Sequence, residues 1–374
     1  MTFNHAREDQ LLLLLALPCR SEPDRCGISD LLREPLDWGY FTDRSRNEGL
    51  SCLIFRHSRD FIDAFPAEVL ERLRRIYYAN MARNLALHEE TKKIVKAFHG
   101  HNIQSMVFKG VSLAQEIYKN IAMRPATDTD LLIRRQDLAQ ADAILQSLGY
   151  RSPACFRDFL DADQLTSLNS LLYVMPDCGP ARRFPVHLHW HLINSTWPLT
   201  ELVRDIDMQR IWSAARSVTL DETMVWTLCP EHLLIYLSHH ALNHNFEKLI
   251  LAADIREVIA AYEQVLDWER LKEDMAAFGL TGIVLKSLEF AGSLLNFDIP
   301  QLGIKPGKSR RGYGLSYFVY LTQCQGWSNR ARFIYRTVAP DRLIIAQSLG
   351  IPLREVRFRH YWERMARRLL VKSP

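Results

Sequence analysis

Residues 101–150 alternate between strand-like and helix-like patterns, inside a chain whose apolar spacing is otherwise mostly helical. The predicted elements, in chain order, are a strand at 103–108, a helix at 111–118, a strand at 127–133 and a helix at 134–148 that ends at Gly149. Strands and amphipathic helices bury their apolar faces against one another. This segment therefore predicts a small sheet with helices packed on it.

Two further strands are predicted at 171–175 and 184–190, and the turn-rich stretch between them predicts a hairpin that joins the same sheet. Helical spacing dominates before residue 100, most clearly at 66–98, and returns from about residue 197. We therefore predict an α+β fold in which a small mixed sheet is embedded between helical regions. The predicted regions are a helical N-terminal region at 1–99, an α/β core at 100–196 and a helical C-terminal region with a basic tail at 197–374.

The composition is that of a folded protein, since 48% of the 374 residues are hydrophobic and 24% are charged, which excludes disordered and fibrous classes. The apolar run from Leu11 to Leu17 is shorter than the ~20 residues of a membrane span, and Glu8 and Asp9 lie where a signal peptide carries positive charge. The seven cysteines include no CxxC pair, which argues against a disulfide framework. We therefore predict a cytoplasmic protein with reduced thiols and no membrane partner.

The small net charge of +4 hides a strong asymmetry along the chain. Residues 301–374 carry 15 Lys and Arg against three acids, a charge of +12, which leaves −8 for the first 300 residues. Such asymmetry indicates a polyanionic partner or substrate.

The pair Asp128-Thr-Asp130 is the most informative chemical feature. Residues i and i+2 of a strand project from one face, so the two carboxylates lie side by side and repel unless a cation joins them. Mg²⁺ binds through a few carboxylates and keeps positions open for water and phosphates. A metal site is therefore one reading of the pair, and a solvated strand end is the other.

The residues before this pair favour the metal reading. Lys109-Gly110 lies between a strand and a helix, where glycine lets the backbone approach a ligand and the helix N-terminus offers N–H groups to an anion. Lys109 and Ser112 are suited to contact phosphate there. A phosphate cradle and a metal-binding pair are thus separated by one helix.

The same segment resembles a known family. The matching residues are Val107-Phe-Lys-Gly-Val-Ser-Leu-Ala114, Tyr118, Met123-Arg-Pro-Ala-Thr-Asp-Thr-Asp-Leu-Leu-Ile133 and Leu148-Gly-Tyr150. They are similar to the signature LKG-x-ALA, LY, RP-x-x-DIDLLV, LGY of an uncharacterised bacterial nucleotidyltransferase family within the DNA polymerase β-like nucleotidyltransferase superfamily. The resemblance is strong over 100–150 and looser over most of the chain.

The resemblance implies an enzyme that moves a nucleoside monophosphate from an NTP, such as ATP, to an acceptor hydroxyl, with release of pyrophosphate. Asp128 and Asp130 would hold Mg²⁺ or Mn²⁺. Lys109, Gly110 and Ser112 would take the place of the superfamily's phosphate loop. Arg124, just before the metal strand, would contact a phosphate oxygen.

One position departs from the superfamily pattern. The strand Val186-His-Leu-His-Trp190 resembles the family's V-D-L-H-W, with His187 where a third carboxylate belongs. Imidazole prefers softer ions than Mg²⁺, so His187, His189 and His191 would tune the site toward a Mn²⁺-like or zinc-like ion. The alternative is a noncatalytic nucleotide-binding or regulatory protein on the same fold.

A second histidine group, His239, His240 and His244 with Asp254, partly matches the HD pattern of metal phosphohydrolases, but no adjacent His-Asp pair is present. We favour a helix pair that closes over the nucleotide pocket, with His244 facing the substrate.

The basic and aromatic run 354–368 has two readings, a nucleic-acid surface and an amphipathic helix with solvated arginines, of which the helix is favoured. The predicted partners are therefore an NTP and an unidentified acceptor, a small molecule or a protein, and a nucleic-acid partner is not favoured. The sequence specifies neither the nucleotide base nor the acceptor.

Overall fold

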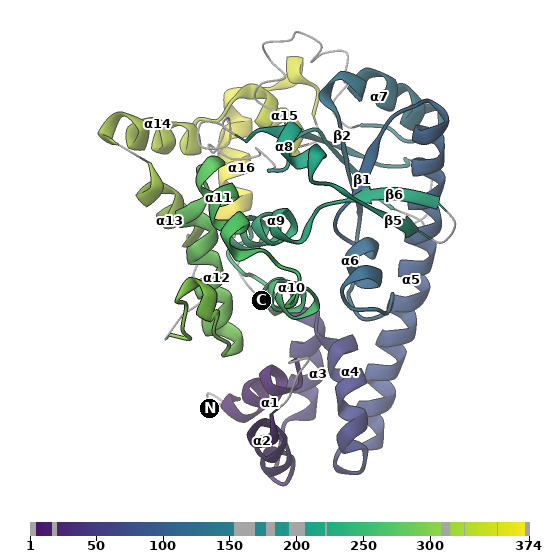
Figure 1. The fold of residues 1–374 in the computed structure, drawn as a ribbon, viewed down its shortest axis with the longest axis vertical. Coiled ribbons are helices and arrows are strands. Elements are labelled where there is room, and N and C mark those ends of the chain that lie inside the picture. The colour runs from purple at the N-terminus through teal and green to yellow at the C-terminus, as the bar shows by residue number, and fades with distance from the viewer. Residues whose placement is uncertain are drawn as a thin grey trace.

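The computed structural model describes residues 5–16, 21–152, 169–176, 184–193, 206–220, 223–307, 315–324, 326–349 and 351–370. Within them, six strands form one mixed sheet in the order β3-β4-β2-β1-β6-β5 (Figure 1). The strands are β1 (Ser105–Val107), β2 (Thr129–Ile133), β3 (Ser170–Tyr173), β4 (Val186–His189), β5 (Arg216–Leu220) and β6 (Thr223–Thr227). The predicted α+β class is confirmed, and so is the order of strand, helix, strand and helix in 101–150.

The centre of the sheet joins strands that are far apart in sequence. β1 pairs antiparallel with β2 and parallel with β6, and β2 pairs parallel with β4. The β2–β4 register sets Asp130 opposite His187 and Leu132 opposite His189. β3 and β4 are antiparallel, which confirms the predicted hairpin, although part of its connection lies outside the described residues.

The hairpin β5–β6 corrects the sequence analysis, which expected only helices after residue 197. Each strand has five residues, and burial alternates along β5, so residues 216–220 carried a strand signal that the sequence analysis missed. The sheet consequently extends past residue 196. The division into regions 1–99, 100–196 and 197–374 remains a proposal.

The N-terminal helices lie below and beside the sheet in Figure 1. They are α1 (Ala6–Ala16), α2 (Glu22–Leu32), α3 (Trp38–Asn47), α4 (Ser51–Ser58) and the long α5 (Ala67–Gly100), with the 3₁₀ turn η1 (Arg59–Ala64) before α5. The end of α5 packs on one face of the sheet through Ile94, Val95 and Phe98. Within the α/β core, α6 (Val111–Glu116) follows β1, and η2 (Arg135–Asp137) and α7 (Leu138–Ser147) follow β2.

Most of the C-terminal helices pack on the opposite face of the sheet and continue to the left in Figure 1, but Leu343 and Ile344 join the apolar layer on the α5 face. They are α8 (Met208–Ser213), α9 (Pro230–Asn243), α10 (Leu249–Ala261), α11 (Trp268–Ala277), α12 (Thr281–Leu295), η7 (Pro300–Leu302), α13 (Leu315–Gln323), α14 (Gly326–Val338), α15 (Arg342–Leu349), η8 (Leu353–Glu355) and α16 (Phe358–Leu370). Among the described residues, no helix combines the length and apolar character that crossing a membrane requires.

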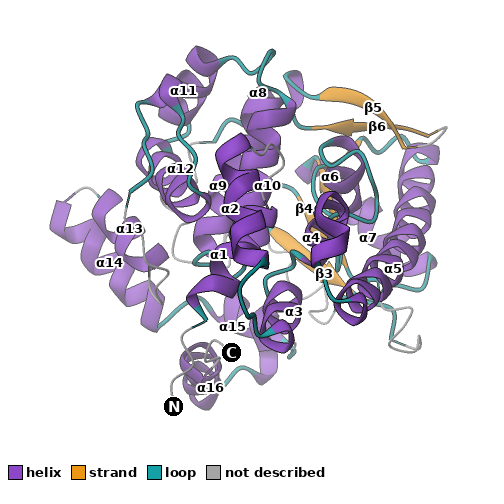
Figure 2. Cartoon of the chain, turned by 90° about the horizontal axis from the view of Figure 1, so that it is seen from below, coloured by secondary structure: helices purple, strands orange, loops and turns teal. Residues whose placement is uncertain are grey.

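Alternation along the strands divides the apolar core into two layers. Val107, Leu131 and Leu188 belong to the layer that includes α5 and α7, as Figure 2 also shows for these helices. Met106 and Leu132 belong to the layer with α9, α10 and α12. Because side chains alternate along a strand, Asp130, two residues before Leu132, faces the α9 side.

Candidate functional site

Asp130 is the centre of a polar cluster on the α9 face of the sheet. Its carboxylate is only 1% exposed and lies 3.1 Å from Lys109 Nζ through Oδ2. The other carboxylate oxygen, Oδ1, accepts a 3.2 Å hydrogen bond from His189 Nε2 and lies 3.8 Å from His187 Nδ1. Residues from the end of β1, from β2 and from β4 thus meet at one carboxylate.

Charge and burial give the two aspartates different proton affinities. Burial and the neighbouring charge of Asp130 raise the pKa of Asp128, whose Oδ1 also accepts a hydrogen bond from Thr127 Oγ1 at 3.0 Å. Burial disfavours the ionised form of Asp130 as well. The Lys109 charge and the His189 hydrogen bond outweigh it, so the pKa of Asp130 lies well below its usual range. Asp130 is the permanent anion of the pair.

The pKa values of the two basic side chains beside Asp130, Lys109 and His187, shift in opposite directions. Burial lowers the pKa of Lys109, but the Asp130 carboxylate more than compensates, so Lys109 stays protonated. Burial lowers the pKa of His187 to about 3, so this imidazole is neutral near pH 7 and has a lone pair available. Asp130 is therefore neutralised by Lys109, and His187 adds a neutral donor.

Gly110 brings the predicted phosphate loop against the aspartate strand. Its φ of +64° lies in the region that favours glycine, and a Cβ there would stand 2.9 Å from the Asp128 carbonyl oxygen. Ser112 is buried and its hydroxyl donates to the Val107 carbonyl at 3.4 Å. Lys109 and Gly110 thus lie beside the aspartates. The Ser112 hydroxyl instead donates to a backbone carbonyl, so its predicted contact with phosphate stays a prediction.

Arg124 is held by a helix of the C-terminal region. Its guanidinium is buried and makes two short hydrogen bonds to Asp254 of α10, Nε to Oδ1 at 2.8 Å and Nη2 to Oδ2 at 2.9 Å. Tyr118 also donates to Asp254 Oδ1 at 2.8 Å. The predicted contact between Arg124 and a phosphate stays a prediction, because the visible role of the side chain is to tie the approach to β2 to α10.

Asn84 of α5 fixes the same approach from the other side. This side chain is fully buried, its Nδ2 donates to the Arg124 carbonyl at 2.8 Å, and its Oδ1 accepts from the Ala126 backbone N–H at 3.2 Å. The segment that carries Asp128 is thus clamped between α5 and α10. Rigid support of this kind keeps site residues within the tolerances that catalysis needs.

One face of α9 extends the site beyond the predicted residues. Tyr236 lies edge-on to Phe108 at a ring distance of 4.8 Å, His240 stacks near Tyr236 at 5.7 Å, and His244 follows at 4.6 Å. Burial and the Lys109 charge hold the pKa of His240 well below its usual range, which places His240 in the field of the cluster. The predicted His244 is exposed and lies 3.3 Å from Glu247 Oε1.

Sequence reasoning missed Tyr236, although the spacing of Tyr236, His240 and His244 at i, i+4 and i+8 already predicts a single helix face. The other histidine readings are not supported within the described residues. His239 faces the Tyr320 hydroxyl at 3.3 Å, and Asp254 belongs to Arg124, so the HD-like group is not assembled. His191 lies beyond the end of β4, with Nδ1 3.2 Å from the Ile193 carbonyl.

A group that could hold a metal ion is formed by Asp130, His187 and His189, whose candidate ligand atoms all lie within 4.8 Å of one another. The other ring nitrogen of His187, Nε2, is 3.3 Å from Ser170 Oγ on β3. A divalent ion is implied by the nucleotidyltransferase resemblance, and a buried carboxylate with convergent donors fits such an ion. Asp128 lies close enough to Asp130 for its charge to matter, but it is outside this group of three.

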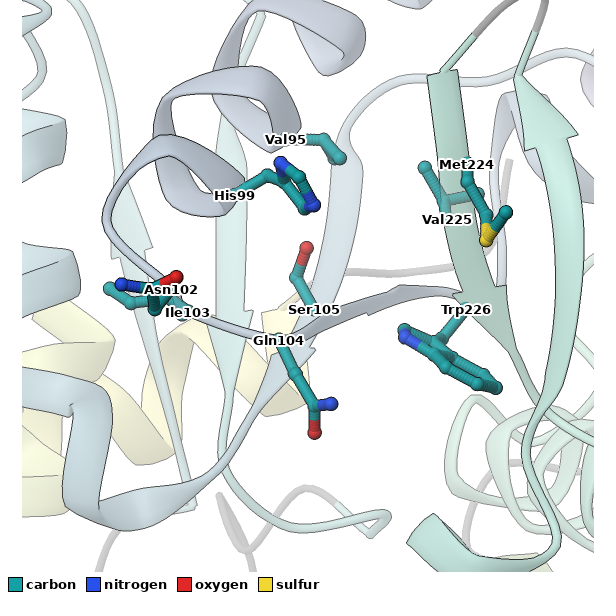
Figure 3. A pocket seen from close by; sticks show the side chains of 9 residues that line it. All are labelled: Val95, His99, Asn102, Ile103, Gln104, Ser105, Met224, Val225 and Trp226. Atoms are coloured by element: carbon teal, nitrogen blue, oxygen red, sulfur yellow. The ribbon is translucent and has the colours of Figure 1, made fainter.

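A pocket of about 360 Å³ lies at the opposite end of β1 and is separate from this cluster (Figure 3). It is lined by the end of α5, by residues 102–105 and by residues 224–226 of β6, and it contains none of the predicted site residues. Its lining includes no Asp, Glu, Lys or Arg.

The comparisons with known proteins agree with this reading at the level of the family. An antigenic nucleotidyltransferase-like protein from Paracoccidioides brasiliensis is similar in structure over 60% of this chain and 94% of its own, with 13% identity and a TM-score of 0.32, a likeness too weak to support an argument. No curated protein matches the chain. Residues 34–296, more than half of the chain, match a family described as uncharacterised nucleotidyltransferase. The chain therefore belongs to the uncharacterised nucleotidyltransferase family.

Proposed function

We propose that the protein is a metal-dependent nucleotidyltransferase that moves a nucleoside monophosphate from an NTP to an acceptor hydroxyl. In this reaction the acceptor oxygen forms a bond to the α-phosphorus, the bond from that phosphorus to the bridging oxygen breaks, and pyrophosphate leaves with the bonding electrons. The observation that supports it best is the buried Asp130 beside Asp128, with Lys109 and Gly110 packed directly against the same strand.

Asp128 and Asp130 would hold the divalent ions, which when bound neutralise triphosphate charge and make the acceptor hydroxyl more acidic. Lys109 lies 3.1 Å from Asp130, and when a divalent ion neutralises that carboxylate the ammonium group would bind a phosphate oxygen instead. Gly110 keeps the loop and the aspartates in contact. Ser112 and Arg124 complete the proposed phosphate site, and His189 and His244 support the metal or the acceptor.

The substrates we propose are an NTP, with ATP as the first to test, and an acceptor that is a small molecule or a protein in the cytoplasm. No general base is assigned. The acceptor proton passes to a group that the chain or solvent supplies after polarisation of the hydroxyl.

The experiment incubates the purified protein with each labelled NTP, Mg²⁺ or Mn²⁺, and a cell extract, followed by mass spectrometry and a pyrophosphate assay. Product heavier by one nucleoside monophosphate is expected. The Asp128→Ala and Asp130→Ala variants should lose product and metal-dependent nucleotide binding, whereas Glu263→Gln, an exposed change beyond α10, should retain both. Appearance of ADP and a phosphorylated acceptor would instead show phosphoryl transfer.

A second candidate is a noncatalytic nucleotide-binding protein, and one observation favours it. Asp130 is already paired with Lys109 and hydrogen-bonded to His189, and His187 stands opposite it in the register where the superfamily pattern expects an acid. Metal-independent NTP binding without pyrophosphate release, in the presence of a broad acceptor panel, would select this candidate.

A further inference from the structure

The side of Asp130 that faces β4 has a different chemistry from the side that faces Lys109. Oδ1 lies 3.2 Å from His189 Nε2 and 3.8 Å from His187 Nδ1, whereas Oδ2 lies beside the Lys109 ammonium. The β4 side therefore offers one carboxylate oxygen and two imidazole nitrogens once the His189 proton resides on Nδ1, because Nε2 must exchange its hydrogen bond to Oδ1 for a lone pair before it can bind a metal. Asp128 is not part of this donor set.

These donors do not match the preference of Mg²⁺, which takes oxygen ligands in nearly octahedral geometry. Two imidazoles and a carboxylate are instead typical of borderline transition ions such as Mn²⁺, Co²⁺ and Zn²⁺, for which nitrogen donors add affinity. Three protein donors also leave coordination positions for water or substrate.

The sheet holds the donors in place before any ion binds. β2 and β4 are paired over four consecutive residues, so Asp130 and His187 sit side by side in a fixed register. The Ser170 hydroxyl, from the antiparallel neighbour β3, lies 3.3 Å from His187 Nε2. A partner on the outer nitrogen orients the ring and leaves Nδ1 toward Asp130, as outer partners of metal-bound histidines do.

His187 Nδ1 keeps its lone pair available for a metal ion. At 3.8 Å from Asp130 Oδ1, it is too distant for a hydrogen bond, so this contact does not consume its lone pair. Lys109 occupies the other carboxylate oxygen and balances the Asp130 charge without covering Oδ1. The space between Oδ1 and the two rings is where the three donors converge.

We propose that Asp130, His187 and His189 form a binding site for a borderline transition-metal ion on the β4 side of Asp130, distinct from the Asp128–Asp130 pair. The site discriminates against Mg²⁺ because two of its three donors are imidazole nitrogens. It makes His187 a selectivity determinant. The proposal concerns binding, so it holds or fails independently of nucleotidyl transfer.

The test uses the full chain with any affinity tag removed and no nucleotide present. Isothermal titration with Mg²⁺, Mn²⁺, Co²⁺ and Zn²⁺ gives the affinities, and the visible absorption of bound Co²⁺ reports nitrogen ligation directly. We expect Co²⁺ and Zn²⁺ to bind at least about tenfold more tightly than Mg²⁺. His187→Asp should shift the preference toward Mg²⁺, and His189→Gln should abolish the Co²⁺ spectrum.

Three further variants keep the outcome decisive. His187→Asn avoids the like-charge repulsion that His187→Asp introduces beside the buried Asp130, and it should weaken Co²⁺ binding. Ser170→Ala removes the hydroxyl that lies 3.3 Å from His187 Nε2 and should weaken Co²⁺ binding by about tenfold. The control His191→Gln lies outside the group and should leave binding unchanged.

Equal affinity for Mg²⁺ and Co²⁺, or an absence of Co²⁺ binding in the unaltered protein, would overturn the proposal. Co²⁺ binding that survives His187→Asn and His189→Gln but disappears in Asp128→Ala would do the same, since it would place the ion at the aspartate pair. Loss of nucleotidyl transfer in a protein that still shows these metal preferences would refute the proposed function and leave this site intact.

Discussion

The ion pair between Lys109 and Asp130 could be predicted from the sequence only in part. The placement of Asp128 and Asp130 on one side of the strand follows from local pattern, whereas the burial of Asp130 beside Lys109 does not. The direct contact depends on antiparallel pairing of β1 with β2, which local pattern does not specify. Arg124 and Asp254 are 130 residues apart, so their pairing had no local signal.

We expect Lys109→Met to destabilise the protein by about 3 to 5 kcal/mol, because it leaves the 1% exposed Asp130 carboxylate without its cation. Urea denaturation in the absence of metal measures the change. The double variant Lys109→Met with Asp130→Asn removes the stranded charge and should recover most of the loss. A double variant no more stable than Lys109→Met would show that the pair is not the source.

Glu257 gives a prediction about pH. Burial raises the pKa of its carboxyl to about 7 in the folded protein, above its ordinary value of 4.5. The folded state then binds the proton more tightly than the unfolded state, so this group destabilises the fold progressively as pH rises from about 4.5 to about 7. Glu257→Gln should therefore be more stable than the unaltered protein at pH 8, by at most about 3 kcal/mol, and nearly equal at pH 4.

Thermal or urea denaturation across this pH range measures the Glu257 effect. The exposed Glu263, just beyond the end of α10, supplies a matched control, since Glu263→Gln removes the same charge from solvent. A stability difference for Glu257→Gln that does not change with pH would contradict the assignment.

At the scale of elements, the strand and helix order of 101–150 was predicted because each segment has its own periodicity. The hairpin β5–β6 was not predicted because the alternation of residues 216–220 was overlooked, and its pairing with β1 through Met106 and Trp226 joins segments far apart in sequence. A short strand at a sheet edge derives its stability from its neighbour more than from its own residues. The sequence analysis assigned His240 and His244 to a helix pair over the nucleotide pocket, but it did not include Tyr236 on the same face of α9.

Gly110 packs the proposed phosphate loop against Asp128, just before β2, and we expect Gly110→Ala to cost at least about 2 kcal/mol of stability. Alanine strains the backbone at φ +64°, and its Cβ would stand 2.9 Å from the Asp128 carbonyl oxygen. NTP affinity should fall with it, as the loop and the aspartates separate. The control Gly100→Ala, at the end of α5 with nothing within 4 Å of its Cβ, should be neutral or slightly stabilising.

At the scale of the whole molecule, part of the positive charge of residues 301–374 lies on the exposed surface around η8 and the start of α16. Arg354, Arg357 and Arg359 are exposed around η8 and the start of α16, whereas Arg364 is buried. Exposed large apolar side chains lie in the same C-terminal region, among them Trp327, Phe358 and Trp362. The predicted helix is present as α16. Its exposed face carries Phe358 and Trp362 as well as arginines, whereas the sequence analysis expected solvated arginines there.

We expect the exposed arginines to steer anionic nucleotides, so the association rate of an NTP should fall between about 50 and about 300 mM NaCl. Arg357→Glu should make that decline shallower and lower the rate at low salt by a few-fold. Stopped-flow binding of a fluorescent NTP measures both. The charge-preserving Arg357→Lys should behave as the unaltered protein, and tight RNA binding that Arg357→Glu abolishes would assign the tail to nucleic acid instead.

The parallel pairing of β1 with β6 also has a consequence for how the chain is made. Roughly 120 residues separate Met106 from Trp226, so a ribosome that adds about 5 to 20 residues per second needs on the order of ten seconds to deliver β6 after β1. During that interval β1, already paired with β2 on one side, presents an open edge that can template association with another nascent chain. Soluble yield should consequently depend on translation speed and chaperone supply more than on the stability of the finished protein.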